Sequence, residues 1–98
     1  MSVELTLELS NRADSAVIQR ALESYQARLG SSIERTQRRL QEFEERYHVT
    51  TAHFLEQMTA EDLEGGDFEY IEWAGEAKLL VGLESEFQAL DHVRYKFP

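Results

Sequence analysis

The sequence predicts a mainly α-helical protein with a small terminal β-ribbon, and three observations support this fold class. Apolar residues recur at helical spacing through most of the chain, strict alternation is confined to its two ends, and the sole proline is the last residue. Residues 1–98 are expected to form a single domain whose core is thin enough to gain from a second copy. We therefore expect a long helix, shorter helices and a helical homodimer.

The two ends of the chain are predicted to be strands, at residues 1–10 and 92–97. Each alternates apolar and polar side chains with the period of two that is typical of a half-buried strand. Glu4 and Glu8 on the first segment could oppose Arg94 and Lys96 on the last, and such cross-strand pairs stabilise a sheet by about 0.2–1 kcal/mol each. The pairing could form within one chain or between two.

A long helix is predicted over residues 12–47, with Ser10 or Asn11 as its N-cap and Asp14 near the positive end of its dipole. Its apolar and semi-apolar residues form a coiled-coil-like seam. The seam consists of Ile18, Leu22, Tyr25, Leu29, Ile33, Thr36, Leu40, Phe43 and Tyr47. We expect Leu22, Tyr25, Leu29, Ile33, Leu40 and Phe43 to serve as its core or dimer contacts.

Gly30 leaves two interpretations of this segment open. It could end one helix, because Ser31 and Glu34 form a possible capping box for a second. A single helix is preferred, because the seam stays in phase across the glycine, which costs only about 1 kcal/mol relative to alanine.

Shorter helices are predicted at residues 50–64, where Thr50 is a suitable cap and Thr59 with Asp62 can cap a further turn before Gly65-Gly66. Asp67 is then expected to cap a last helix over residues 67–90.

The charge is strongly acidic and unevenly distributed. Ten Lys and Arg against nineteen Asp and Glu give a net charge of −9, of which residues 51–98 carry −8. This charge attracts cationic partners and repels phosphate, so nucleic acid is not an expected ligand. No segment approaches the roughly 18 apolar residues of a membrane span, which predicts a cytoplasmic protein without a membrane partner.

No catalytic, metal or cofactor site is expected. The chain has no cysteine, and His48, His53 and His92 form no recognisable pair with a nucleophile. The carboxylates around Gly65-Gly66 do not have the spacing of an EF-hand loop, and the glycines lack the lysine of a phosphate loop.

The segment 61–76, EDLEGGDFEYIEWAGE, is the strongest candidate for a functional site. It holds seven carboxylates and no base, together with aromatic residues. An aromatic surface with an acidic rim suits a basic protein partner, whereas the structural alternative makes Trp73 a core residue and the glutamates a solvated rim. The predicted partner-binding residues are Phe68, Glu69, Tyr70, Glu72, Trp73 and Glu76.

Two motifs resemble a family of small bacterial proteins regarded as antitoxins of type II toxin–antitoxin systems. They are Leu40-x-x-Phe43-Glu44-x-x-Tyr47-x-x-Thr50-x-x-x-Phe54-Leu55 and Asp67-Phe68-x-x-x-Glu72-Trp73-Ala74-Gly75-Glu76. The resemblance covers roughly residues 33–92, and its EWAGE-like segment is the most specific part. The chain departs from the family pattern at His48, where a glycine is usual, and in its longer acidic run before Asp67.

The resemblance implies a protein without enzymatic activity that binds and neutralises a cognate protein toxin. A basic toxin would agree with the acidic charge. Two alternatives are an oligomeric scaffold and a DNA-binding autorepressor of the ribbon-helix-helix type.

Overall fold

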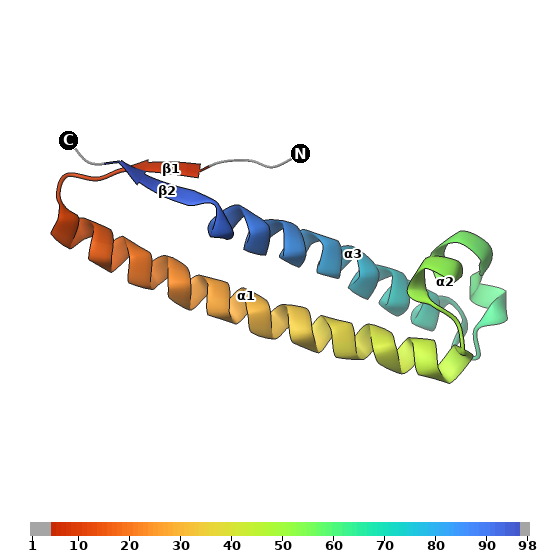
Figure 1. The fold of residues 1–98 in the computed structure, drawn as a ribbon. Coiled ribbons are helices and arrows are strands. Elements are labelled where there is room, and N and C mark those ends of the chain that lie inside the picture. Colours follow the sequence, from red (N-terminus) through yellow and green to blue (C-terminus); the bar gives the residue numbers. More distant parts are fainter. Residues whose placement is uncertain (1–4, 97–98) are drawn as a thin grey trace. The chain divides into compact units, whose positions relative to one another are not determined.

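The computed structural model describes residues 5–96 and confirms the mainly α-helical fold with a small terminal sheet (Figure 1). In chain order the elements are β1 (Leu5–Glu8), α1 (Arg12–Tyr47), α2 (Thr51–Gln57), a 3-10 turn (Ala60–Asp62), α3 (Gly66–Asp91) and β2 (Val93–Lys96). None of the described helices combines the length and hydropathy needed to cross a bilayer.

The helix starts follow from short polar side chains. The Asn11 side chain accepts a hydrogen bond from the Asp14 amide at 2.9 Å, and the Thr50 hydroxyl accepts one from the His53 amide at 3.0 Å. Thr59 and Asp62 form a capping box around the 3-10 turn. These three groups satisfy amides that have no partner inside their own helices.

Two features of the helices were established only by the structure: whether α1 is interrupted at Gly30, and where α3 begins. α1 continues through Gly30, which agrees with the preferred single helix. α3 begins at Gly66, whose φ is +61°, so Asp67 lies in the first turn of the helix rather than before it. An aspartate in that turn still interacts favourably with the helix dipole.

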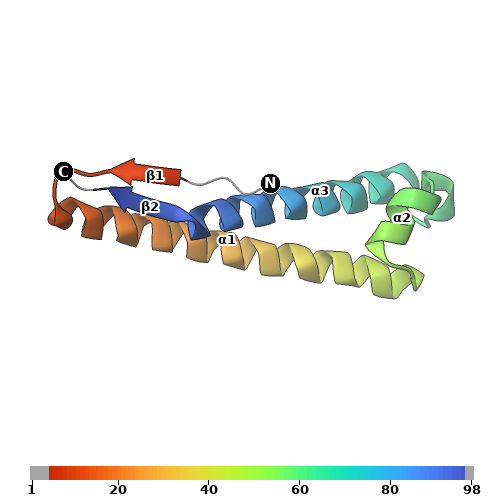
Figure 2. The same cartoon turned by 45° about the horizontal axis from the view of Figure 1, so that its top comes forward.

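The chain divides into two compact units, and whether it behaves as a single domain stays a prediction. The first unit comprises residues 1–32 and 83–98. In its described part, β1 and β2 lie side by side as a parallel pair (Figure 2). Leu7 lies opposite Tyr95 and Glu8 opposite Lys96. Lys96 Nζ lies 3.6 Å from Glu8 Oε1, which confirms that predicted pair, whereas Glu4 is outside the described residues.

Within this first unit, the start of α1 packs against the end of α3. Leu29 is the only large apolar side chain in its described part that is buried. Tyr25 Oη donates to Glu86 Oε2 at 3.0 Å, and this hydrogen bond is the main cause of the raised pKa of Tyr25. A Cβ at Gly30 would lie 3.8 Å from the Phe87 ring, an ordinary packing distance.

The second unit, residues 33–82, contains the larger core. It combines the end of α1, α2 and the start of α3. The chain leaves α1 at His48, whose φ of 56° is in the left-handed region. The buried residues of this core are Leu40, Phe43, Phe54, Leu63 and Trp73, of which Phe54 and Trp73 are fully enclosed.

The seam of α1 faces the protein's own α3 in each unit. Leu29, Leu40 and Phe43 are buried, and Leu22 and Ile33 are half-buried. Tyr25 is 38% exposed. Much of the seam is therefore used within one chain, and a homodimer stays a prediction.

Candidate protein-binding surface

The structure separates the predicted partner-binding residues into an inner and an outer group. Trp73 is completely buried and Glu69 is 8% exposed, whereas Phe68 is 88% exposed. Tyr70 and Glu76 are half-buried, and Glu72 is exposed. Successive residues of a helix are rotated by about 100°, so adjacent residues in this segment point to different faces of α3.

Trp73 is the centre of an aromatic stack. Its ring lies 3.9 Å from that of Phe54 and 5.1 Å from that of Phe43, with interplanar angles of 2° and 9°. The Tyr47 ring is 5.7 Å away. Trp73 Nε1 donates to Thr51 Oγ1 at 3.0 Å, so the one polar atom of the indole is also satisfied. Contact between this ring and a partner would require the core to open.

Glu69 joins the end of α1 to the start of α3. Its carboxylate accepts hydrogen bonds from Arg46 Nη1 at 2.7 Å, from the Tyr47 hydroxyl and from the Gly65 amide at 3.3 Å. The Arg46 guanidinium also reaches Glu64 at 3.1 Å. A nearly buried carboxylate is stable only with such partners, so Glu69 has a structural role within the unit.

The surroundings of Glu69 constrain two other residues. Burial, followed by the hydrogen bond to Glu69, raises the pKa of Tyr47 above its ordinary value. A Cβ on Gly65 would lie only 2.8 Å from Glu69 Cβ, so a larger residue there would displace the carboxylate.

Glu72 is already paired inside the unit, with the guanidinium of Arg39. Arg39 also lies 3.0 Å from Glu42 and over the Phe43 ring. Arg39 and Arg46 of α1 are therefore both paired with acids of the same unit.

The face of α3 turned away from the core carries an apolar row that we call the outer stripe. Its large members are well exposed: Phe68 at 88%, Ile71 at 68% and Leu79 at 50%. Gly75 and Gly82 continue the row, at spacings of three and four residues that keep it on one side of the helix. The outer stripe consists of Phe68, Ile71, Gly75, Leu79 and Gly82.

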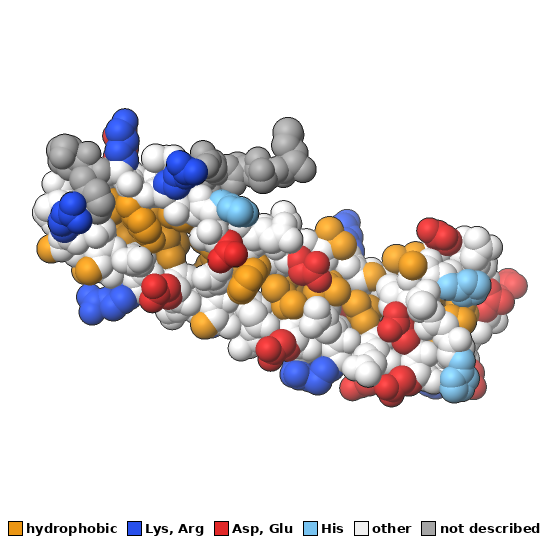
Figure 3. Space-filling view, in the orientation of Figure 1, with side chains coloured by type: hydrophobic (Ala, Val, Ile, Leu, Met, Phe, Trp, Pro, Cys, Tyr) orange, Lys and Arg blue, Asp and Glu red, His pale blue; other side chains and the backbone are white. Residues whose placement is uncertain are grey.

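Carboxylates border the outer stripe. Glu72 and Glu76 follow its edge on the α1 side, and Asp67 and Lys78 lie on the other edge. The second unit contains twelve acids and five bases, and Figure 3 shows acidic side chains gathered around α2. The outer stripe is therefore an apolar surface in an acidic setting.

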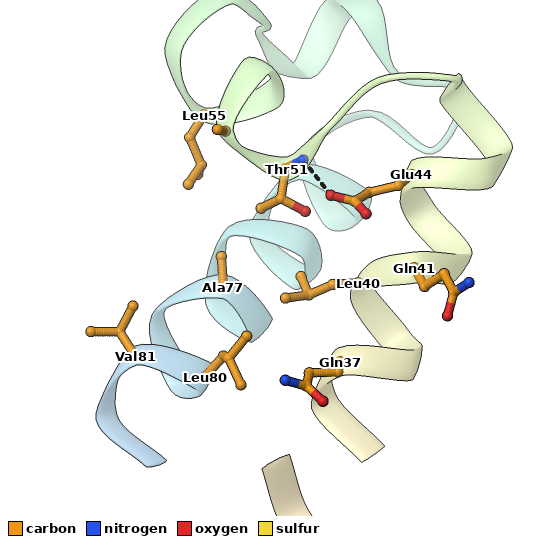
Figure 4. A pocket seen from close by; sticks show the side chains of 10 residues that line it. Gln37, Leu40, Gln41, Glu44, Thr51, Leu55, Ala77, Leu80 and Val81 are labelled. Carbon is orange, nitrogen blue, oxygen red and sulfur yellow. Dashed lines mark hydrogen bonds between the residues drawn. The ribbon is translucent and has the colours of Figure 1, made fainter. Parts of the chain in front are cut away.

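A second apolar surface lies in the same unit, between α1, α2 and α3 (Figure 4). It is a groove of about 620 Å³ lined by carbon atoms of Leu40, Leu55, Ala77, Leu80 and Val81. Gln37, Gln41, Glu44, Thr51 and Ala52 complete its wall, and Glu44 accepts a hydrogen bond from the Thr51 amide at 2.6 Å. The only formal charge in the wall is thus already engaged.

Ile71, Leu79 and the groove residues Leu55 and Val81 are not among the partner-binding residues predicted from the sequence. A signal was present, because α3 has apolar residues on all sides, and such a helix must be covered from more than one direction. The fold covers one of those directions and leaves the outer stripe exposed.

Comparisons of the chain with protein-family models, with curated proteins and with solved structures gave no match. Within residues 5–96, no group of three or more His, Asp or Glu side chains is placed to hold a metal ion.

Proposed function

We propose that this chain is an antitoxin-like protein without enzymatic activity, which binds and neutralises a basic protein toxin in the cytoplasm. The observation that carries the proposal is the exposure of Phe68 and Ile71 next to carboxylates. Large apolar side chains in such a setting are typical of a protein interface, and the acidic excess accelerates the approach of a cationic partner.

Burial of Trp73 and Glu69 changes which residues carry the contact. Trp73, Glu69 and the half-buried Tyr70 hold the helix in place, and Phe68, Ile71, Glu72 and Glu76 meet the partner. The proposal therefore keeps the predicted segment and moves the contact to its outer side. The neutralising role itself is what the resemblance to antitoxins implies.

Co-expression with the product of the neighbouring gene tests this function. Phe68→Gln with Ile71→Gln should reduce capture of that product and rescue of growth, because both apolar contacts become polar. The matched control is Leu55→Gln with Val81→Gln, which changes two exposed apolar residues of the groove. Equal capture by both double variants would contradict the proposed surface. If the wild type does not capture the neighbouring gene product, the proposal that this chain binds that product as a toxin is wrong.

An oligomeric scaffold is the second candidate, and the thin core of the first unit favours it. Leu29 is the one large apolar side chain buried in its described part, while Val17 is 57% exposed. Light scattering during size-exclusion chromatography distinguishes the candidates, since a scaffold should assemble without a partner. Arg39 and Arg46 are engaged with the protein's own acids and the net charge of −9 opposes binding to phosphate, so the DNA-binding alternative is not proposed.

A further inference from the structure

The two glycines of the outer stripe reduce helix stability, and no packing contact within residues 5–96 requires a glycine at either position. Among the described residues, no atom from another part of the chain lies within 4 Å of a Cβ placed on Gly75 or Gly82. Each glycine costs about 1 kcal/mol relative to alanine in a helix interior. Their absent side chains leave a low path along the helix surface, with Phe68, Ile71 and Leu79 standing beside it.

The dimensions of this path fit another helix. Gly75 and Gly82 are seven residues apart, two helical turns, so both lie on the same line along α3. From Phe68 to Gly82 the outer stripe extends about 21 Å at the helical rise of 1.5 Å per residue, which is the length of a four-turn helix. Small side chains at a contact allow two helix axes to approach more closely.

The charge of the border decides between possible occupants. In an antiparallel pair of identical chains, each edge meets the same edge of its mate, so Glu72 and Glu76 would face their own copies. Such like-charge contacts oppose association. A basic partner would instead oppose Glu76, Asp67 and the exposed side of the Glu72 carboxylate, and the unfavourable charges it would meet are Lys78 and the Arg39 guanidinium that already pairs with Glu72.

We propose that the outer stripe docks one amphipathic helix of the protein partner, with an apolar face that lies over Gly75 and Gly82 and with Lys or Arg along the edge that meets Glu72 and Glu76. This inference rests on the proposed function and adds the kind of element that is recognised. The apolar anchors of the complex are Phe68, Ile71 and Leu79, and the glycines set the depth at which the partner helix lies.

A peptide experiment tests the docking surface without the natural partner. The probe is a synthetic peptide of about 15 residues made of leucine and lysine, with leucines at helical spacing. One comparison peptide has the same composition in scrambled order, and another carries glutamate in place of lysine. Binding to the full chain is measured by fluorescence anisotropy. The amphipathic basic peptide should bind at least about tenfold more tightly than either comparison peptide.

The decisive variant is Gly75→Gln with Gly82→Gln. Glutamine forms helices better than glycine, and its Cβ would meet no atom from another part of the described chain at either position, so the variant should unfold at a higher temperature than the wild type. Its side chains fill the path, so peptide affinity should fall by about tenfold or more. Ser31→Gln, which enlarges another exposed position on a helix, is the matched control and should leave affinity unchanged.

Unchanged affinity in the double glycine variant, or equal binding of the scrambled peptide, would overturn the docking mode. The co-expression assay separates this failure from that of the proposed function. Capture of the neighbouring gene product by both the wild type and the glycine variant would support toxin binding and contradict the docking of a partner helix over Gly75 and Gly82. Peptide binding that depends on the glycines, without capture of that product, would support the docking of a helix over Gly75 and Gly82 and contradict toxin binding.

Discussion

The inner and outer faces of α3 differ in how completely their side chains are used. On the inner face, Trp73 is enclosed by three rings and donates its hydrogen bond, and Glu69 has three partners. On the outer face, Phe68 and Ile71 are exposed. Gly75 lowers helix stability there, although no described part of the chain outside the helix would contact a Cβ at that position. The difference shows that one short segment contributes both core residues and an exposed apolar surface, and that packing within the chain accounts only for the core residues.

The largest expected effect is on the inner face. Trp73→Ala should reduce the free energy of unfolding by about 3–5 kcal/mol, because it removes the centre of the aromatic stack. Phe68→Ala should change it by less than about 0.5 kcal/mol, as expected at an exposed position. Urea unfolding measures both values. Similar losses for the two variants would erase the distinction between the faces.

The second-largest expected change in the free energy of unfolding is that of Glu69→Ala. The substitution leaves the Tyr47 hydroxyl and the Gly65 amide without their acceptor, and we expect a loss of about 1–3 kcal/mol. Glu76→Ala, on the same helix, is the control and should have a much smaller effect. If thermal unfolding shows the order reversed, the carboxylate network does not stabilise the unit as described.

A gain in stability is expected at the turn between α1 and α2. His48 has a φ of 56°, which a side chain disfavours by about 1–2 kcal/mol. His48→Gly should recover about 1 kcal/mol, whereas the same change at His53 inside α2 should be destabilising. A lower melting temperature for His48→Gly would show that the histidine contributes a contact that outweighs its backbone cost.

The outer stripe should tolerate a single methyl group. Gly75→Ala should raise the free energy of unfolding by about 0.5–1 kcal/mol, because alanine favours the helix and a Cβ has free space there. Gly65→Ala is the informative contrast, since its Cβ would collide with Glu69 and should destabilise the unit. Calorimetry distinguishes the opposite signs. A loss at Gly75 would reveal a structural need for glycine.

The smallest effect is a dependence on alkaline pH. The pKa of Tyr47 is raised by burial and by Glu69, so folding favours its protonated form. This contribution is complete below the ordinary tyrosine pKa of about 10 and disappears as pH rises through the higher folded value. Urea midpoints measured from neutral to alkaline pH should therefore fall less steeply for Tyr47→Phe than for the wild type. If the urea midpoints of the two proteins fall in parallel with pH, the pKa of Tyr47 is not raised by folding.

Some features of the fold could be predicted because they depend on local patterns. The period-2 ends, the capping residues Asn11, Thr50 and Thr59, and the phase of the seam across Gly30 all led to elements that the structure contains. The site was harder to predict, because composition marked residues 61–76 as interaction-prone without distinguishing contacts within the chain from contacts with a partner.

The sequence by itself determined the helical architecture, the acidic charge and the position of the aromatic segment, since these follow from periodicity and composition. Only the tertiary structure decided that Trp73 and Glu69 face inward while Phe68 and Ile71 face solvent. The physical reason is that α3 is apolar on all sides, so its own pattern does not select a buried face. That choice is made by the rings of Phe43 and Phe54 and by the guanidinium of Arg46, which come from other elements of the unit.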